Sequence, residues 1–201
     1  ELFEQLDAKT LCANLKLSGR RKDGMRSNYD PPDWHLFEVG KAKVAVIGLI
    51  TPFMHAWFVG DRYDDKMTVM SNREGLRKVM PAVLEAEPDL IVLASHQGFV
   101  PVRGRGANRL FEVAREFPEI DVMLGAHTHL EIPGKKIGHD TWYSQAGAHG
   151  EYLGVIKVVV DLAEHEPVSI QSSLVSVKEA PTEEELIMPE VGRMFFTNED
   201  A

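Results

Sequence analysis

Three histidines have the residue type and the spacing of metal ligands. His127 and His129 stand two positions apart and follow the apolar run Ile120 to Leu124, while His96 follows the apolar run Leu90 to Ala94. In β geometry, residues i and i+2 share a face about 7 Å apart, so both imidazoles of the pair can approach one metal cluster. Neutral imidazoles are common transition-metal ligands, and the pattern therefore predicts a metal site.

The elements around these histidines predict an α/β fold. Helical periodicity separates the apolar runs, and the order strand, helix, strand, helix, strand is typical of parallel βαβ units. Ligands in open α/β sheets bind at the carboxyl ends of the strands, so we expect the three imidazoles to meet at that edge. The predicted elements are strands at Lys43–Ile50, Leu90–Ala94 and Ile120–Leu124, with helices at Arg73–Ala86 and Asn108–Glu116.

Further elements flank this unit. Pro81 falls inside the first helical pattern and predicts a kink or a split. The segment from Phe53 to Met70 is a long connection, of the kind that is usually functional or a lid. After Pro133 the pattern changes to strands, which we expect to pair antiparallel and to form a second sheet or extend the first. The other predicted elements are a helix in Glu1–Lys9, strands at Leu11–Leu17, His35–Val39, Thr141–Gln145, Tyr152–Leu162 and Val168–Val177, and an exposed loop at Ser18–Pro32.

The composition excludes several classes of protein. With 201 residues, 44% of them hydrophobic and 26% charged, the chain is typical of a globular domain with its own core. A formal charge of −9 argues against binding to a nucleic-acid duplex, although metal ions can still attract a phosphorylated substrate. No apolar run reaches the roughly 18–20 residues of a membrane-spanning helix. The single cysteine, Cys12, has no partner for an internal disulfide.

The acidic residues do not complete a metal site in an obvious way. Hydrolytic two-metal sites normally use carboxylates as well as imidazoles. Asp89 and Asp121 lie at strand starts, which is the wrong end of the sheet. The loop acids Asp61, Asp64 and Asp65 are interpreted as solvent-facing or capping residues. The histidines at 35, 139 and 165 are interpreted as ordinary polar or packing residues. Two further histidines, His55 and His149, lie near the proposed sheet edge.

Five segments, in order and at matching spacing, carry a family resemblance across about residues 10 to 162. They are Ala13-Asn14, Lys43 to Pro52, Ile91 to Gly98, Ile120 to His129, and Gln145 to Gly154. Together they resemble the catalytic domain of the 5′-nucleotidase and 2′,3′-cyclic-nucleotide phosphodiesterase family, within the calcineurin-like metallophosphoesterases. The segment Thr51 to Trp57 and Asn108 lean toward the cyclic-nucleotide branch.

The resemblance implies a fold, a cofactor and a reaction. The fold is an α/β/β/α four-layer sandwich with mixed sheets, and two divalent ions (Mn, Zn, Mg, Fe or Ca) lie at the strand ends. His96 and His127 resemble ligands of one ion and His129 a ligand of the other, with groups near Gln97 and Thr128 orienting the rings. The implied reaction is hydrolysis of a nucleotide or other phosphoester. Asn14 and His149 are candidate substrate-binding residues.

The chain also departs from the family pattern. The family's Gly-His-x-His is here Ala126-His-Thr-His129, and its Asp-x-His, Gly-Asp and Asn-His motifs would precede Glu1. We therefore expect residues 1–178 to be the C-terminal portion of a catalytic domain and 179–201 a linker toward a further domain. The catalytic histidine is expected upstream, none is assigned in this chain, and the 201 residues alone are predicted to have little or no hydrolase activity.

Two alternatives remain at this point. The first is a catalytically silent metal-binding or interaction domain on the same scaffold. The second is a zinc amidohydrolase, which also uses His-x-His but needs a barrel of eight βα units, more than this chain contains. The compartment is left open, and a periplasmic, secreted or cell-envelope location follows from the resemblance alone.

Overall fold

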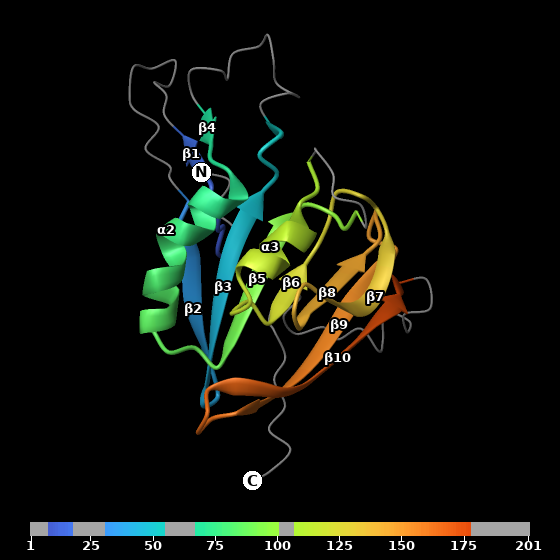
Figure 1. The fold of residues 1–201 in the computed structure, drawn as a ribbon. Helices are drawn as coiled ribbons and strands as arrows, with labels where there is room; N and C mark the ends of the chain where they lie inside the picture. The colour runs from blue at the N-terminus through green and yellow to red at the C-terminus, as the bar shows by residue number, and fades with distance from the viewer. Residues whose placement is uncertain (1–7, 18–30, 55–66, 101–106, 178–201) are drawn as a thin grey trace.

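A computed structural model describes residues 8–17, 31–54, 67–100 and 107–177 of the chain (Figure 1). Several predicted segments lie wholly or largely outside these residues: most of the loop at Ser18–Pro32, most of the helix at Glu1–Lys9, most of the long connection with His55, and the segment 179–201.

A six-stranded mixed sheet forms the centre of the described structure (Figure 1). Its strand order is β2-β3-β5-β6-β8-β7. The four middle strands run parallel to one another, and each outer strand is antiparallel to its neighbour. The α/β class and the mixed sheet are thus confirmed. The strands are β2 (Trp34–Val39), β3 (Ala42–Ile50), β5 (Leu90–His96), β6 (Val122–Leu124), β7 (Glu131–Ile137) and β8 (Thr141–Ala146).

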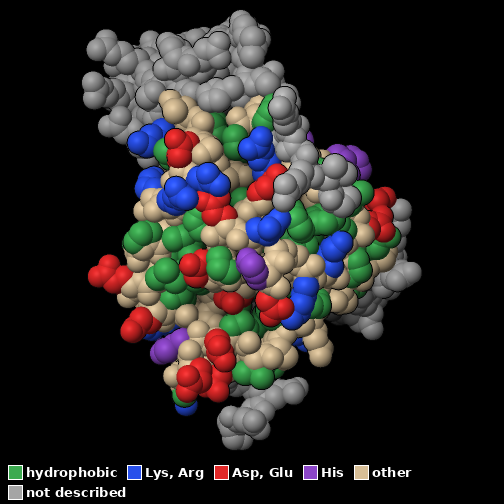
Figure 2. Space-filling view, viewed as in Figure 1, with side chains coloured by type: hydrophobic (Ala, Val, Ile, Leu, Met, Phe, Trp, Pro, Cys, Tyr) green, Lys and Arg blue, Asp and Glu red, His purple; other side chains and the backbone are tan. Residues whose placement is uncertain are grey.

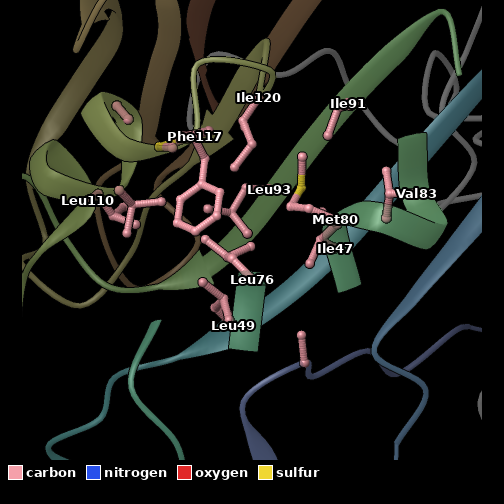
Figure 3. Close-up of a cluster of buried hydrophobic side chains, with 14 of the residues drawn as sticks. Ile47, Leu49, Leu76, Met80, Val83, Ile91, Leu93, Leu110, Phe117 and Ile120 are labelled. Carbon is pink, nitrogen blue, oxygen red and sulfur yellow. The ribbon is translucent and has the colours of Figure 1, made fainter. Parts of the chain in front are cut away.

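Two helices cover one face of this sheet. Helix α2 (Asn72–Glu85) begins with a capping box in which Ser71 and Glu74 bond each other's backbone N–H groups. Helix α3 (Leu110–Glu116) lies beside it, and Arg73 and Arg77 of α2 both form ion pairs with Glu116. Figure 3 shows the core between the helices and the sheet, which includes Leu76, Met80, Val83, Leu110, Phe117, Ile47, Leu49, Ile91 and Leu93.

A two-stranded antiparallel sheet covers the opposite face. Strands β9 (Tyr152–Asp161) and β10 (Glu166–Ser176) place Ile156, Val158 and Ile170 against a second apolar cluster of the central sheet. The Trp142 indole donates a hydrogen bond to the Ser172 hydroxyl and links β8 to β10. The described residues therefore form three layers, helices, sheet and sheet. A further antiparallel pair, β1 (Leu15–Leu17) with β4 (Met67–Val69), lies near the carboxyl end of β3.

The structure differs from the sequence-based expectation at several elements. Strand β7 was not predicted, because Pro133 and Gly134 interrupt it; a register shift between Ile132 and Lys135 accommodates them. Strand β8 pairs parallel with β6 and so extends the first sheet, whereas only its pairing with β7 is antiparallel. Helix α2 continues through Pro81, which is exposed.

The outer surface of the helix layer carries both signs of charge. Figure 2 shows basic and acidic side chains interspersed on this face without a patch of one sign. Such a surface is typical of a solvated face and adds no support for a nucleic-acid duplex as partner. Within the described ranges, no helix is long and apolar enough to cross a membrane.

Candidate metal centre

His96 is the last residue of β5, at the carboxyl edge of the parallel strands. The register pairs it with Ile50, the last residue of β3, so both strands end at the same level. Side chains alternate between faces along a strand, and His96 has the parity of Leu90 and Val92. Those residues belong to the cluster beneath β9 and β10, so the imidazole projects toward the face of the second sheet.

The loop after β6 brings His127 beside His96. Two backbone bonds fix its start: Gly125 donates to the Ser144 carbonyl at 2.9 Å and Ala126 donates to the Gln97 carbonyl at 2.8 Å. The ring centroids of His96 and His127 are 5.4 Å apart, in an edge-to-face arrangement. The sequence-based expectation that two separate strands deliver imidazoles to one place thus matches the geometry of these two rings.

Burial lowers the pKa of His127, and the neighbouring His96 and His129 lower it further. Removing an imidazole from water disfavours its charged form, and a second positive charge nearby disfavours it again. Both effects favour the neutral form of the His127 imidazole. The neutral imidazole is the form that binds metal ions, so the electrostatics of the loop suit a metal ligand.

His129 lies next to a fourth histidine. His149 follows β8, and the centroids of the two rings are 5.7 Å apart. The imidazoles at this edge therefore form two neighbouring pairs, His96 with His127 and His129 with His149. No group of three or more His, Cys, Asp or Glu side chains within the described ranges is arranged to hold a metal ion.

A buried glutamine supports His96. Gln97 and Asn72 exchange two amide hydrogen bonds, of 2.9 and 3.0 Å, and both side chains are buried. Gln97 also donates to the Ile50 carbonyl at 3.2 Å. The residue after His96 is thus tied to the first residue of α2 and to the end of β3, which fixes the backbone that carries the imidazole.

A second buried glutamine supports His129. In the amide orientation that pairs every group, the Gln145 oxygen accepts from the backbone N–H groups of His129 at 3.0 Å and Leu130 at 2.8 Å. Its nitrogen then donates to the hydroxyls of Tyr143 at 2.6 Å and Thr128 at 3.0 Å. Sequence reasoning missed this role. The available signal was a polar residue, Gln145, at the end of the predicted strand Thr141–Gln145.

The two histidine segments also touch each other directly. A Cβ added to Gly98 would lie 2.1 Å from Thr128 Oγ1 and 2.3 Å from Thr128 Cγ2. Glycine at 98 thus allows the residue between His127 and His129 to pack against the segment that follows His96. The close approach couples the positions of the two loops.

Asn14, a candidate substrate-binding residue, is fully buried. Its amide nitrogen donates to the carbonyls of Ile50 and Met70, and its oxygen accepts from Ile50 N–H at 3.0 Å. These bonds tie the chain before β1 to the ends of β3 and β4. The observed role is therefore to hold the scaffold beneath the sheet edge.

The strand-start acids lie at the opposite edge, as expected. Asp89 accepts from the Lys43 N–H at 2.6 Å, and Asp121 accepts from the Ile91 N–H at 2.7 Å. The remaining described histidines are also away from the candidate centre. His35 contacts the Phe37 ring edge-to-face, His165 forms a hydrogen bond with Asp89, and His139 lies in the β7–β8 turn.

No protein-family model matches the chain. It is 27% identical over 180 residues to the uncharacterized metallophosphoesterase YunD of Bacillus subtilis, covering 88% of this chain and 34% of that protein. It is 26% identical over 133 residues to a 2′,3′-cyclic-nucleotide 2′-phosphodiesterase/3′-nucleotidase of Salmonella typhimurium, covering 59% of this chain and 20% of that protein. The chain thus spans about a third or less of the length of these relatives.

Solved structures show the same fold. A putative 5′-nucleotidase from Staphylococcus aureus superposes with a TM-score of 0.69 at 25% identity, covering 87% of this chain and 34% of that one. The calcineurin-like phosphoesterase YfkN of Bacillus subtilis superposes with a TM-score of 0.71 at 19% identity, covering 86% of this chain and 57% of that one.

The donor set at the sheet edge fits part of a metal centre. Neutral imidazoles suit Zn²⁺, Fe²⁺ and similar ions, and His96 and His127 offer two of them side by side. Carboxylates, which harder ions prefer, are represented among the described strand-start acids only at the far edge of the sheet. The described residues therefore supply imidazole ligands to this edge but not a carboxylate bridge.

Proposed function

We propose that this chain is part of a metal-dependent phosphoesterase. The proposal proceeds from its relatives and structural neighbours, which are 5′-nucleotidases, a 2′,3′-cyclic-nucleotide phosphodiesterase and calcineurin-like metallophosphoesterases. Its substrate is a nucleotide or another phosphoester. The chain contributes His96, His127 and His129 as metal ligands.

One observation carries the proposal. The His96 and His127 rings, delivered by two neighbouring parallel strands, lie 5.4 Å apart at the carboxyl edge of the sheet. This edge is where α/β folds bind ligands.

The chain's own residues hold and orient the ligands. His96 and His127 bind one ion, and His129 binds the other. Gln97 and Gln145 fix the backbone of His96 and His129 through buried hydrogen bonds. Such supporting bonds orient imidazole ligands in metal sites. Divalent ions held by these imidazoles would supply Lewis-acid chemistry, which would polarise phosphoryl oxygens and lower the pKa of a water molecule.

The rest of the centre comes from sequence outside this chain. In this proposal, residues 1–178 belong to the C-terminal portion of a catalytic domain. The carboxylate ligands and the catalytic histidine are supplied by an N-terminal half of the domain. The 201 residues alone therefore have little or no hydrolase activity.

Hydrolysis of bis-p-nitrophenyl phosphate with Mn²⁺ tests the proposal. The chain joined to an N-terminal half that carries the missing ligands should turn over, and His96→Ala or His127→Ala should lower kcat/KM by at least about 100-fold. His139→Ala, in the turn at the other end of the sheet, is the matched control and should retain activity. Strong turnover by the isolated chain, or full activity of both variants, contradicts the proposal.

A second candidate function has one observation in its favour. The imidazoles at the carboxyl edge stand in two pairs, and the described acids Asp89 and Asp121 lie at the other edge of the sheet, so these residues could bind an ion without supplying a carboxylate bridge. Such a domain would bind metal through the same imidazoles without hydrolysis. Inactivity of the joined protein despite bound metal would decide for this candidate.

A further inference from the structure

We propose that His129 and His149 form a second two-imidazole site, which binds one divalent ion apart from the His96 and His127 pair. The inference rests on the proposed function and deepens it, because it adds His149 to the metal ligands. The ion is one that prefers nitrogen donors, such as Zn²⁺ or Co²⁺.

The spacing of the rings carries the first step. Two imidazoles on one tetrahedral ion, with metal–nitrogen distances of about 2.0–2.1 Å, have ring centres roughly 5 Å apart. The centroids of His129 and His149 are 5.7 Å apart, close to the 5.4 Å between His96 and His127. Both pairs therefore stand close to the separation that a shared ion requires.

Two independent segments bring the second pair together. His129 follows β6, and His149 follows β8, the neighbour of β6 in the sheet. The Gly147 N–H donates to the Leu130 carbonyl at 3.0 Å, so the loop of His149 is bonded directly to the residue after His129. The two rings thus meet because of the sheet topology and a backbone bond between their loops.

The backbone at both histidines is unusual. His129 has φ 55° and His149 has φ 58°, in the left-handed region that favours glycine. Such a conformation is unfavourable for a residue that carries a Cβ. The loop after β8 also contains glycines at positive φ, at 147 and 150, so the chain places a histidine between residues of the type that would relieve the strain.

The second pair is accessible to an ion from solvent. His129 and His149 are both exposed, and a Cβ on Gly150 would meet no atom within 4 Å. By contrast, His127 is partly buried beside His96. The two pairs therefore differ in burial, so their affinities for the same ion should differ and can be measured separately.

Equilibrium dialysis of the 201-residue chain against Zn²⁺, with metal quantification, tests the inference. We expect two ions per chain at saturation. His149→Gly should bind one, as should His96→Gly, while the double variant should bind none. Glycine is chosen at 149 because it removes the ring and relaxes the backbone, so a lost ion cannot be attributed to a strained loop. The control is His139→Gly, which should still bind two.

The absorption of Co²⁺-loaded protein gives a second readout. Loss of a nitrogen ligand should weaken the visible bands of only the affected site in each variant. This inference alone is overturned if His149→Gly still binds two ions per chain. It is also overturned if the unmodified chain binds only one ion and His149→Gly binds that ion as well. No Zn²⁺ binding at all also overturns this inference alone, because the proposed function takes its remaining ligands from outside this chain. Zn²⁺ binding that is unchanged in both His96→Gly and His149→Gly overturns the ligand assignment of the proposed function as well.

Discussion

The side chain of Gln145 accepts hydrogen bonds from the backbone of His129, at 3.0 Å, and from the next residue, at 2.8 Å. Gln145 is buried at the end of β8, whereas the imidazole of His129 is exposed. The position of a candidate metal ligand on the surface is thus fixed from inside the sheet. Four hydrogen bonds converge on one amide, and they join the strand to the loop that carries the histidines.

Gln145→Ala should lower the free energy of unfolding by about 2–4 kcal/mol. The substitution leaves two backbone N–H groups and the Tyr143 and Thr128 hydroxyls without this partner, and buried unpaired groups are costly. Urea unfolding measures the change, and Gln171→Ala on the exposed side of β10 is the matched control. Zn²⁺ affinity should fall as well, about 10–100-fold. Equal stability of the two variants would contradict this account of Gln145.

Gly98→Ala should destabilise the chain by about 1–3 kcal/mol, because the added methyl overlaps the Thr128 side chain. Thr128 must then shift, and its neighbours His127 and His129 move with it. Gly154→Ala is the control, since its Cβ would meet its nearest neighbour at an ordinary 3.6 Å. Thermal unfolding with and without Zn²⁺ measures both effects. A smaller Zn²⁺-induced rise in Tm for Gly98→Ala than for Gly154→Ala is expected.

His127→Gly should be more stable than His127→Ala by about 1 kcal/mol when metal is removed by chelation. His127 has φ 69°, which glycine adopts freely and alanine does not. His35 in β2 is the control position, because in an extended strand glycine is the less stable of the two by roughly 0.5–1 kcal/mol. Denaturant unfolding of the four variants gives both differences. If the glycine variant were the less stable of the two at position 127 as well as at position 35, the left-handed backbone of His127 would not be maintained.

Asp121 should make stability depend on pH. Burial raises the pKa of Asp121 to about 6, with a further increase from Glu166, although hydrogen bonds from backbone N–H groups oppose it. The folded state therefore binds this proton more tightly than the unfolded state, whose pKa is about 3.9. The contribution is fully present below about pH 4 and is lost as pH rises through about 6.

Comparison with Asp121→Asn isolates this contribution. The stability of the unmodified chain relative to Asp121→Asn should fall by on the order of 2–3 kcal/mol between about pH 4 and pH 6.5. The amide oxygen can still accept from the Ile91 N–H, so that bond does not confound the comparison. Chemical unfolding at several pH values is the measurement. A difference that is constant with pH would exclude a raised pKa.

The sequence was sufficient where local pattern and global fold agree. The apolar runs at Leu90 and Ile120 predicted buried parallel strands, and the placement of His96 and His127 follows from their ends. Asp89 and Asp121 were placed correctly at the other edge, since both precede their strands in the chain. Here the direction of a strand alone decides which residues share an edge.

The sequence did not predict the structure correctly where tertiary contacts override the local preference of a segment. Pro81 does not interrupt α2 because it lies on the exposed side, where the carbonyl that it leaves unpaired faces water. Leu84 is apolar but 45% exposed, since the buried stripe of α2 ends at Val83. Strand β7 depends on pairing with β8 around a bulge, which no local pattern shows. The pairing of His129 with His149 depends on the order of strands in the sheet, which adjacency in sequence does not give.

The carboxylates of Asp89 and Asp121 have a consequence for the far end of the molecule. Asp89 accepts a hydrogen bond from the N–H of Lys43 near the start of β3, and Asp121 accepts one from the N–H of Ile91 near the start of β5, so these bonds help to fix the alignment of β3, β5 and β6. A slip of one residue would rotate every side chain of β5 to the other face, and His96 would then point toward the helices. The position of the His96 imidazole thus depends on hydrogen bonds at the opposite end of the strands. A change in strand register would disrupt the candidate metal site even though every histidine remained in the sequence.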